Sequence, residues 1–475
     1  MCTVFFAAIL AENIPSRMTL IKSISGIRGT IGGAPGDNLT PIDAVKFAAG
    51  YGSWLKTRTS NPTVVIGRDA RPSGPMLEQL VISTLQGLGF DVINAGLSTT
   101  PTVEMLVPRY TAAGGIILTA SHNPEQWNAL KLLNEKGEFV SGDDGAEILR
   151  LAESTDLDFA EVGDLGTLTA CEDGMDWHID QVLALPSVDV AAVQAAGFKV
   201  AIDAVHSSGS VAIPMLLDKL GVAYHNLYPE PHGRFPHNPE PLEQHLGAII
   251  DEVSNGSYDL GIVVDPDVDR LAFIDEKGGM FGEEYTLVVV ADYLLSLTPG
   301  HVVSNMSSSK ALRDLAESKG STYSPSAVGE VNVVNEMKAK HAVLGGEGNG
   351  GIILPELHYG RDALVGIALA LTHLAKSGKT MSELRASYPQ YYMAKQKIEL
   401  TPGLDVDGIL STMAGHYSEE ELSTIDGVKI TWSDRWVHLR KSNTEPIIRI
   451  YTEAPSTEEA TRLGERFMKE IEELV

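Results

Sequence analysis

The sequence contains very little cysteine, and this limits both its chemistry and its location. Cys2 and Cys171 are the only cysteines among 475 residues, so a disulfide framework and a cysteine metal cluster are excluded. Such cysteine usage fits a reducing compartment, and we expect the protein to be cytoplasmic. The sequence also lacks any run of the roughly 20 apolar residues that a membrane-spanning helix requires. We therefore expect no membrane partner.

Basic residues are scarce as well. Lys and Arg total 36 against 63 Asp and Glu, which gives a net charge of -27. A surface this acidic disfavours binding to nucleic acid and repels phosphorylated small molecules. An anionic substrate would therefore need local arginines, helix N-termini or a metal ion. No feature of the sequence specifies an oligomeric state.

The periodicity of the chain predicts several α/β domains. A chain of 475 residues exceeds one hydrophobic core, because domains average about 150 residues. Short Val- and Ile-rich runs alternate with longer amphipathic stretches, which is typical of mixed or parallel sheets. Three strands that each run into a small-residue loop indicate three similar domains. We predict strands at 63–67, 91–96, 114–120, 261–264 and 301–307, a strand followed by a loop at 198–209 and at 342–353, and helices at 42–56, 75–89, 212–221, 283–296 and 310–320.

The two ends of the chain have a different character. Residues 1–17 are interpreted as an N-terminal tail, because Met18 opens a more ordinary start. Near the other end, strand patterns crowd together before one closing amphipathic helix, which predicts a smaller α+β domain. We predict strands at 395–400, 427–434, 435–442 and 446–454, a helix at 456–475, and domains at 18–165, 166–275, 276–390 and 391–475.

The segment VVDPDVDRLAF places three aspartates at positions 265, 267 and 269. In a regular strand alternate side chains lie about 7 Å apart, too far to share a small cation. Pro266 predicts a turn that folds the carboxylates inward, where a divalent ion, Mg²⁺ above all, would offset their repulsion. A solvated acidic turn is the alternative. An EF-hand fails because Arg270 stands where that loop needs glycine, whereas a phosphatase with Asp265 as nucleophile stays open.

The segment GGIILTASHNPEQWNALK ends a buried strand in Ser121. Pro124 prevents continued strand pairing, and the amides of the turn could face an anion. His122 is a poor triad base for Ser121, since neighbouring side chains diverge in an extended segment. A helix-capping serine is the alternative reading.

Arginines gather at three other loops. These are SGIRGT with Arg28, IGRDARPSG with Arg68 and Arg71, and LRKSNTEPIIRIY with Arg440 and Arg449. The last segment could form a phosphate cradle from guanidinium, hydroxyl, amide and backbone NH groups. Its polar members are Arg440, Ser442, Asn443 and Thr444.

A fourth loop, LGGEGNGG, is rich in glycine. Its glycines permit close approach of a ligand, and Glu347 and Asn349 offer groups that read sugar hydroxyls. The glycine order is wrong for a dinucleotide fold. A glycine-rich turn without a ligand is the alternative.

Taken together and in this order, the motifs resemble those of the α-D-phosphohexomutase family. That family includes phosphoglucomutase, phosphomannomutase and phosphoglucosamine mutase. The resemblance rests on SGIRG at 25–29, TASHNP at 119–124 with Lys131, DPDVDR at 265–270, GEGNGG at 346–351 and RKSNTEP at 440–446. It implies four domains around a central cleft: three similar mixed-sheet α/β domains and a C-terminal α+β domain like the TATA-binding protein.

The resemblance also implies an isomerase mechanism. Ser121 would be a phosphoserine that gives its phosphate to a hexose monophosphate. The sugar 1,6-bisphosphate formed in this way would turn in the cleft and return its other phosphate to Ser121. A sugar 1,6-bisphosphate would also serve as activator. Mg²⁺ would be held by Asp265, Asp267, Asp269 and a phosphate oxygen on Ser121. The remaining implied roles are charge neutralisation by Arg28 and Arg270, acid–base catalysis by Lys131 with help from His122, sugar contacts from Glu347 and Asn349, and phosphate contacts from Arg440, Ser442, Asn443, Thr444 and Arg449.

Three positions depart from the family pattern and bear on the substrate. Ala129 follows Asn128 where the family often has glycine, His232 stands where an aspartate is common, and GEGNGG replaces a Glu-x-Ser-Gly-His form. His232 and Asn349 would lie in segments that the family brings to the cleft. We expect conversion of glucosamine 6-phosphate to glucosamine 1-phosphate, with a phosphomannomutase or phosphoglucomutase as the alternative.

Overall fold

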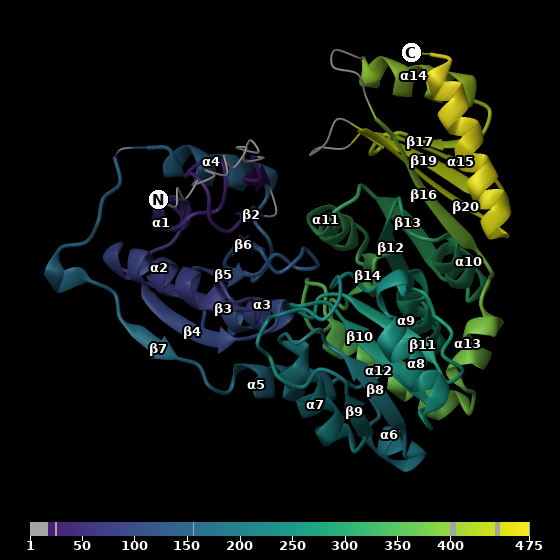
Figure 1. Ribbon diagram of the computed structural model, residues 1–475, viewed down its shortest axis with the longest axis horizontal. Coiled ribbons are helices and arrows are strands. Elements are labelled where there is room, and N and C mark those ends of the chain that lie inside the picture. The colour runs from purple at the N-terminus through teal and green to yellow at the C-terminus, as the bar shows by residue number, and fades with distance from the viewer. Residues whose placement is uncertain (1–17, 24–25, 155, 400–404, 442–446, 475) are drawn as a thin grey trace, which may run out of the picture.

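The computed structural model describes residues 18–23, 26–154, 156–399, 405–441 and 447–474. The tail expected at 1–17 lies outside these described residues. These described residues form four sheets, which follow one another in an arc from the first domain to the C-terminal domain (Figure 1). Within the described part of the chain, no helix combines the length and apolarity that a bilayer crossing requires.

The first domain is built on a seven-stranded sheet in the order β1-β2-β6-β5-β3-β4-β7. All five residues of β5 are buried, as expected for a strand with neighbours on both sides. β7 pairs with β4 and so extends this sheet past residue 165, where we had placed a domain boundary. The strands are β1 (Ile21–Ser23), β2 (Gly26–Thr30), β3 (Thr63–Arg68), β4 (Asp91–Leu97), β5 (Gly114–Leu118), β6 (Trp127–Leu133) and β7 (Leu168–Ala170), and the helices are α1 (Pro41–Lys56), α2 (Gly74–Gly87), α3 (Thr100–Arg109) and α4 (Gly142–Ala152).

The second domain has a four-stranded sheet in the order β11-β10-β8-β9. The segment 198–209, predicted as a strand that runs into a loop, has its strand end at Asp203, and the chain turns through Val205 and His206 at positive φ before α7 begins. The strands are β8 (Lys199–Asp203), β9 (Ala223–Asn226), β10 (Leu260–Val264) and β11 (Leu271–Asp275), and the helices are α5 (Gly174–Leu183), α6 (Val190–Ala196), α7 (Gly209–Leu220) and α8 (Gly247–Asn255).

The third domain repeats that order as β13-β12-β14-β15. Its core is continuous with that of the second domain, because α12 packs against α5, α6 and α7. The strands are β12 (His301–Asn305), β13 (Thr322–Ser326), β14 (Leu344–Glu347) and β15 (Gly351–Ile353), and the helices are α9 (Glu283–Leu297), α10 (Lys310–Ser318), α11 (Glu330–Lys340), α12 (Ala363–Ser377) and α13 (Met381–Ser387).

The same strand pattern occurs in all three domains. A first strand has a parallel neighbour on each side, and one of those neighbours continues into an antiparallel partner. The antiparallel pairs are β5 with β6, β10 with β11, and β14 with β15. The loop inside each pair carries one of the motifs found in the sequence, so the repeat places those motifs at equivalent positions.

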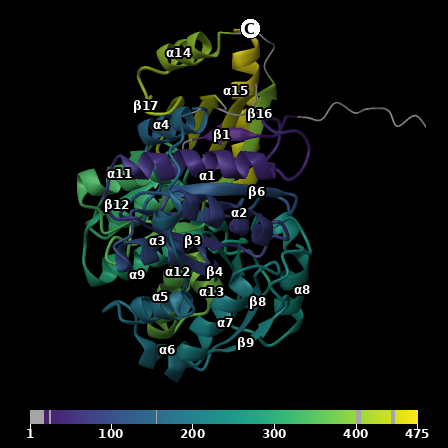
Figure 2. The same ribbon diagram turned by 90° about the vertical axis from the view of Figure 1, so that its left-hand side faces the viewer.

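The C-terminal domain has one antiparallel sheet in the order β16-β20-β19-β18-β17. The helices of this domain, α14 and α15, lie at one end of the molecule in both views. Helices α6 and α7 of the second domain lie at the other end (Figure 1 and Figure 2). Helix α14 was absent from our prediction, and residue 400 of the predicted strand lies outside the described residues. The elements are β16 (Tyr392–Glu399), α14 (Val406–His416), β17 (Glu421–Ser423), β18 (Val428–Thr431), β19 (Trp436–Lys441), β20 (Ile447–Ala454) and α15 (Thr457–Glu472).

Candidate active site

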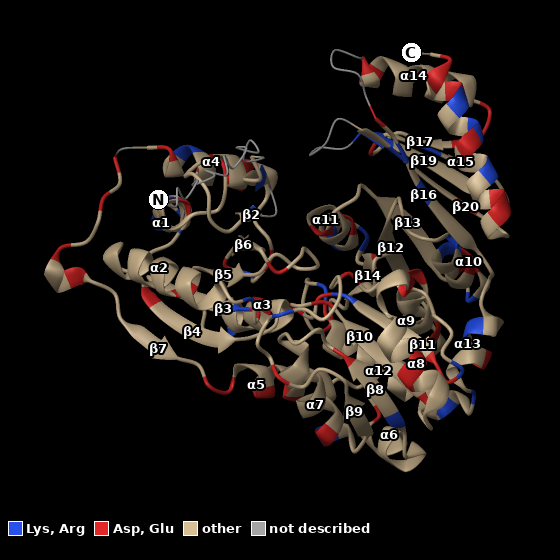
Figure 3. Ribbon diagram, viewed as in Figure 1, with Lys and Arg blue, Asp and Glu red and all other residues tan. Residues whose placement is uncertain are grey.

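A cavity of about 920 Å³ is lined by residues from all four domains. Basic residues lie on the strands around β19, and acidic and basic residues both occur where α3, β10 and β14 approach one another (Figure 3). The structure thus brings most of the predicted site residues together. Those that line the cavity are Arg28, Ser121, His122, Lys131, Arg270, Glu347, Asn349, Arg440 and Arg449.

Ser121 lies in the loop between β5 and β6. Its backbone has φ 48°, a left-handed conformation that is uncommon for residues other than glycine and that clusters at functional sites. Its hydroxyl donates a 2.7 Å hydrogen bond to Oδ2 of Asp265. Ser121 therefore does not cap a helix; it faces the aspartate loop of the second domain.

Arg71 binds the backbone of the loop that carries Ser121. Its side chain is completely buried, and all five guanidinium N–H groups donate hydrogen bonds. One goes to Asp69 and four go to backbone carbonyls, those of Ser121, Asn123, Pro124 and Trp127. Arg71 is thus fully used within the protein, which contradicts our interpretation of its loop as an anion site.

Arg68, in the same predicted loop, is also used internally. Its Nε donates to Glu78 at 3.3 Å, and its Nη1 donates to the carbonyl of Asp69. Neither it nor Arg71 lines the cavity.

The loop after β10 turns sharply, as we predicted from the position of Pro266. Val268 has φ 64°, and Oδ1 of Asp265 accepts hydrogen bonds from the backbone amides of Asp269 and Arg270 at 3.2 and 3.1 Å. One carboxylate oxygen from each of the three aspartates lies within 4.8 Å of the others. All three aspartates are buried, so they do not form a solvated acidic turn.

Two cations balance these carboxylates. Lys131 donates to Oδ2 of Asp267 at 2.6 Å and to Oδ2 of Asp269 at 3.2 Å, and Arg361 donates to Asp269 at 2.7 Å. Burial favours a higher pKa for Asp269, but Arg361 and Lys131 outweigh it and lower the pKa. Burial and the charges of Asp269 and Asp267 raise the pKa of Asp265 well above its ordinary value.

The aspartates also retain unused donor atoms. Oδ1 of Asp267 and Oδ1 of Asp269 are buried and have no hydrogen-bond partner within the described part of the chain. Buried polar atoms are almost always paired, so two unpaired oxygens in one cluster need an explanation. Carboxylate oxygens are the ligands that Mg²⁺ prefers, so this donor set fits that ion.

Two arginines, Arg28 and Arg270, line the cavity together with Ser121. Arg28, on β2, donates to Oδ1 of Asn123 at 3.2 Å, and burial together with the charge of Arg270 lowers the pKa of Arg28. Arg270 contributes an Nε that is buried without a hydrogen-bond partner among the described residues. Two guanidinium groups that line one cavity are suited to hold a phosphate between them.

His122 lies closer to Ser121 than we expected. Its Nδ1 is 3.4 Å from the hydroxyl of Ser121, because the left-handed backbone at Ser121 replaces the extended one that would separate the side chains. Burial and the charges of Arg270 and Arg28 lower the pKa of His122 well below its ordinary value. The imidazole is therefore neutral at physiological pH.

The glycine-rich loop places Glu347 and Asn349 in the cavity wall. Glu347 accepts hydrogen bonds from Asn305 at 2.8 Å and from Arg361 at 3.0 Å, and Asn349 donates to it at 3.5 Å. These bonds fix the carboxylate that would meet a ligand. The loop is thus ordered by side chains as well as by glycines.

Two functional candidates escaped the sequence analysis. Arg361 connects three carboxylates, those of Asp269, Glu330 and Glu347, at 2.7 to 3.0 Å. Glu330 lines the cavity at the start of α11, and burial raises its pKa to about 7 although Arg361 opposes the rise. Each is a single charged residue in a loop or at a helix start, so no local pattern distinguishes it from a surface charge.

The C-terminal domain contributes a second positive region. Arg440 on β19 and Arg449 on β20 are directly opposite each other across the two strands, an arrangement that repels unless an anion or a carboxylate lies nearby. Asp426 pairs with Nε of Arg440 at 3.0 Å. Lys395, on the neighbouring strand β16, also lines the cavity. The predicted partners Ser442, Asn443 and Thr444 lie outside the described residues.

His232 does not reach the cavity, contrary to our prediction. Its exposed ring stacks on His206, with ring centroids 4.0 Å apart, and it is not among the lining residues. The neighbouring Gly233 explains this placement: it has φ 71°, and a Cβ there would lie 1.9 Å from the carbonyl oxygen of Ala70. This close approach holds the loop against the first domain.

Family models match four consecutive parts of the chain. Those for the phosphoglucomutase/phosphomannomutase α/β/α domains I, II and III match residues 20–158, 176–279 and 282–392, and that for the C-terminal domain matches residues 394–470. Each range holds all or nearly all strands of one sheet. The chain is thus similar to this family over almost its whole length and in the same domain order.

Known relatives and a solved structure agree with this match. The phosphoglucomutase/phosphomannomutase of Thermococcus kodakarensis is 35% identical over 452 residues, covering 94% of this chain and 98% of the relative. The phosphoglucosamine/phosphogalactosamine mutase of Sulfurisphaera tokodaii is 30% identical over 457 residues, covering 94% and 98%. A crystal structure of a phosphoglucomutase/phosphomannomutase family protein from Burkholderia thailandensis shares the fold, with a TM-score of 0.82, 22% identity and 96% of both chains covered.

Proposed function

Because the chain belongs to the phosphoglucomutase/phosphomannomutase family, the α-D-phosphohexomutases, we propose that it interconverts glucosamine 6-phosphate and glucosamine 1-phosphate. It is a phosphohexomutase, an isomerase that moves a phosphoryl group between positions of one sugar. We assign the reaction to the cytoplasm, in keeping with the low cysteine content and the buried free thiol of Cys171.

Ser121 is the proposed phosphate carrier. The main support for this role is the 2.7 Å hydrogen bond from Ser121 to Asp265 at the cavity wall. Arg28 and Arg270 line the same cavity. A phosphoryl group on this oxygen would meet positive charge from both arginines, and such neutralisation is the main catalytic contribution in phosphoryl transfer. The strained backbone of Ser121 keeps the oxygen directed at this position.

The proposed reaction consists of two transfers that mirror each other. A sugar hydroxyl attacks the phosphorus on Ser121, so that a new O–P bond forms while the bond to Oγ breaks and the hydroxyl proton leaves to a base. The bisphosphate then turns in the cavity. Oγ of Ser121 attacks the other phosphate, which regenerates the phosphoserine and releases the isomeric monophosphate with a proton on its free hydroxyl.

Glu330 is the proposed proton acceptor, with Lys131 as a cationic partner. A pKa of about 7 matches the task of a general base at neutral pH. Burial favours a lower pKa for Lys131, but the carboxylates of Asp267 and Asp269 raise it above the ordinary value. Lys131 therefore stays protonated and serves to hold charge or to donate a proton, and His122 is a secondary neutral contact.

Asp265, Asp267 and Asp269 are the proposed Mg²⁺ ligands, together with a phosphate oxygen on Ser121. When bound, the ion would withdraw charge from the phosphoryl group. The support is the pair of unpartnered buried oxygens described above. When Ser121 has lost its phosphate, a sugar 1,6-bisphosphate would phosphorylate it again and so act as activator.

Arg440 and Arg449 are proposed to bind the phosphate that is not being transferred. Their cross-strand position brings two positive charges to one face of the C-terminal sheet, and both line the cavity. Ser442, Asn443 and Thr444 would complete this site. Because the substrate binds in two orientations, a fixed distal site lets either end of the sugar meet Ser121.

The choice of glucosamine rests on the carboxyl groups of the cavity. Glu240, Glu284, Glu330 and Glu347 line it, and the amine of glucosamine is protonated near neutral pH, so it finds acceptors that a neutral sugar does not need. The name of the Sulfurisphaera tokodaii relative supports this choice, and that of the Thermococcus kodakarensis relative supports a glucose or mannose phosphate instead. Measured kcat/KM values for glucosamine 6-phosphate, glucose 1-phosphate and mannose 1-phosphate distinguish them. A tenfold preference for either neutral sugar would refute the glucosamine assignment.

Intact-mass measurement tests the phosphoserine. The purified protein should carry a fraction with one added phosphate, and Ser121→Ala should lose both that fraction and turnover. Ser307→Ala is the matched control, since Ser307 lines the same cavity but pairs with His438 at 3.0 Å rather than with a carboxylate. A phosphatase that uses Asp265 would instead keep turnover in Ser121→Ala and lose it in Asp265→Asn.

A further inference from the structure

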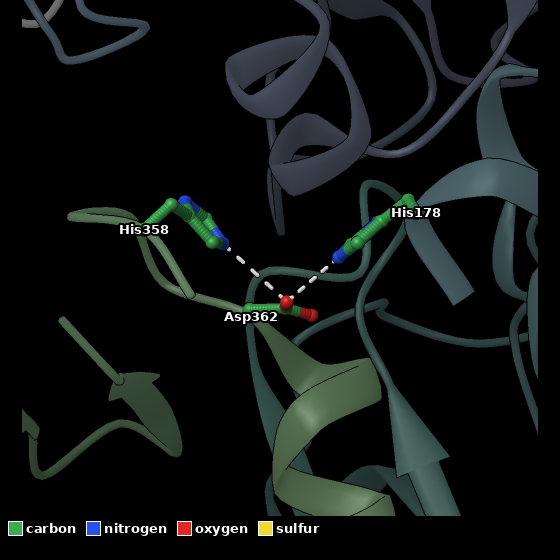
Figure 4. A group of neighbouring side chains, drawn as sticks. All are labelled: His178, His358 and Asp362. Carbon is green, nitrogen blue, oxygen red and sulfur yellow. Dashed lines mark hydrogen bonds and ion pairs between the residues drawn. The ribbon is translucent and has the colours of Figure 1, made fainter. Parts of the chain in front are cut away.

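A second cluster of ligating side chains lies where the first three domains meet. It consists of His178 on α5, His358 in the loop before α12, and Asp362, which caps α12. Oδ2 of Asp362 is 2.9 Å from Nε2 of His178 and 3.4 Å from Nε2 of His358, so both imidazoles point to one oxygen (Figure 4). His178 and Asp362 are fully buried, and the side chain of His358 is 11% exposed.

The far nitrogen of each imidazole also faces an oxygen. Nδ1 of His178 is 2.9 Å from the hydroxyl of Thr102, and Nδ1 of His358 is 3.5 Å from Oε2 of Glu104. Both of these residues belong to α3 of the first domain. A histidine that binds a metal through Nε2 ordinarily donates its Nδ1 proton to such an oxygen, which fixes the tautomer and the ring.

Glu104, on α3, has a buried carboxylate without a hydrogen-bond partner among the described residues. The residue is 2% exposed. The carboxylate is nevertheless pressed against the loop that carries the histidine, because a Cβ on Gly360 would lie 1.8 Å from Oε2. An unpaired buried carboxylate is costly, and an imidazole held as an Nδ1–H donor would satisfy it.

We propose that His178, His358 and Asp362 bind one divalent transition-metal ion, with Zn²⁺ as the best fit. Two nitrogens and one carboxylate oxygen are a donor set that suits zinc, and a fourth position would be taken by water. Ligand atoms around a tetrahedral zinc lie about 3.3 Å apart, given bonds of about 2.0 to 2.1 Å. The two oxygen–nitrogen separations, 2.9 and 3.4 Å, bracket that value, and the three ligand atoms all lie within 4.8 Å of one another.

This site differs chemically from the aspartate triad of the active site. The triad offers only oxygen ligands, which suit Mg²⁺, whereas imidazole nitrogen favours later transition metals. The new site also contains no cavity-lining residue. Its role is structural: the ion would connect α5 and α12 directly, and α3 through Thr102 and Glu104. Bound zinc should therefore stabilise the domain junction.

Metal analysis in the presence of Mg²⁺ tests this proposal. The full-length protein is stripped with a chelator, incubated with Zn²⁺ and millimolar Mg²⁺, desalted, and analysed for metal by mass spectrometry. We expect one zinc per chain in the wild type and loss of it in His178→Gln and in His358→Gln. His373→Gln is the matched control, because His373 forms a single imidazole–carboxylate pair with Asp292 at 2.9 Å and should keep the zinc.

Three further measurements distinguish the two metal sites and control for misfolding. Asp267→Asn removes a ligand of the triad and should leave zinc binding unchanged. Co²⁺ bound to the wild type should give the visible absorption of a tetrahedral ion, which an octahedral oxygen site lacks. Glu104→Gln should retain the fold and weaken zinc binding by about 10- to 100-fold, the usual effect of losing a carboxylate behind a ligating histidine.

Three outcomes would overturn the proposal. The wild type could hold no zinc when Mg²⁺ is present, which would show that the cluster is held by hydrogen bonds and protons alone. Zinc could persist in folded His178→Gln and disappear in Asp267→Asn, which would place it at the triad. Bound Co²⁺ could show only the weak spectrum of an octahedral ion. None of these results would bear on the mutase activity itself.

Discussion

The hydroxyl of Ser121 donates a hydrogen bond of 2.7 Å to Asp265, a residue 144 positions later in the chain. Ser121 lies in the loop between β5 and β6, and Asp265 lies in the loop between β10 and β11. These are equivalent antiparallel pairs in two repeats of one sheet topology. The third repeat places Glu347 at the end of β14, directly before the corresponding loop, and Arg361 links Glu347 to Asp269. Repetition of one domain thus produces an active site with three different loops.

Arg71→Lys is predicted to destabilise the protein and to misplace Ser121. Lysine keeps the charge but has three donors instead of five, so at least two of the five oxygens now bound by Arg71 would lose their partner. We expect a loss of about 2 to 4 kcal/mol in the free energy of unfolding, because each orphaned buried acceptor costs about 1 to 3 kcal/mol. Urea denaturation measures the first effect and kcat the second.

Arg68→Lys is the control for that change. Arg68 is the last residue of β3, three positions before Arg71, but it is partly exposed and donates to Glu78 and to one carbonyl. We expect it to lose less than about 1 kcal/mol and to keep normal kcat. Equal losses in the two variants would contradict the role of Arg71 in shaping the Ser121 loop.

Mg²⁺ is predicted to raise the thermal stability of the protein through the aspartate triad. A ligand at 100 times its Kd adds about 2.7 kcal/mol to the folded state. Asp267→Asn should lose most of this gain, since Asp267 is buried and supplies one of the unpartnered oxygens. Thermal unfolding with and without Mg²⁺ measures it, and Asp434→Asn, on an exposed turn, should respond like the wild type. Equal stabilisation of Asp267→Asn would place the ion elsewhere.

The sequence predicted those parts of the site whose residues form local patterns. DPDVD is a short motif between two apolar strands, so its turn and its inward carboxylates followed from Pro266 and from charge repulsion. The family resemblance, carried by ordered motifs, predicted four domains around a cleft, and the sheets and the family match confirm that architecture. The roles assigned to individual residues stay predictions.

Features that depend on long-range packing could not be predicted from the sequence. Arg361 and Glu330 acquire their environment from three separate segments that meet only in the fold. Arg71 resembles any loop arginine until the carbonyls around it are seen. The position of His122 was misjudged because one backbone angle, φ at Ser121, reverses the direction that a strand would give. Such single-residue conformations have no sequence signature.

Arg440→Gln and Arg449→Gln are predicted to weaken substrate binding more than catalysis. Each should raise KM by about 10- to 100-fold, which corresponds to about 1.5 to 3 kcal/mol for a hydrogen bond to a charged group. Lys397→Gln is the matched control, because Lys397 is opposite Arg449 on β16 but is exposed and outside the cavity lining. Steady-state kinetics measures the effect. A fall in kcat at unchanged KM would contradict a distal phosphate site.

Inorganic phosphate offers a separate check on those two arginines. Arg440 and Arg449 lie opposite each other and both line the cavity, so phosphate bound by them should raise the Tm of the wild type. The same anion should raise the Tm of Arg440→Gln less, because one of the two cationic ligands is gone. An equal rise in both proteins would mean that phosphate acts at another site, such as the one beside Arg28.

The pH dependence of catalysis is predicted to follow Glu330. Burial raises the pKa of this carboxyl to about 7, and a general base must be ionised, so kcat/KM should rise with pH up to about 7 and then level off. Glu330→Gln should lower kcat/KM by about 100-fold or more, in the usual range for a catalytic base, and should abolish this limb of the profile. A rate profile that keeps the limb in Glu330→Gln would assign it to another group.

The same titration should appear in the stability of the protein, with a sign that separates it from an effect on chemistry alone. Because the pKa of Glu330 is higher in the folded than in the unfolded state, the folded state binds the extra proton. Its contribution to stability is therefore fully present below the unfolded value and is lost as the pH rises toward 7. Glu330→Gln should remove that loss, so its free energy of unfolding should decline less than that of the wild type between about pH 4.5 and 7. Urea denaturation across this range measures the difference, and parallel declines in the two proteins would contradict a raised pKa at Glu330.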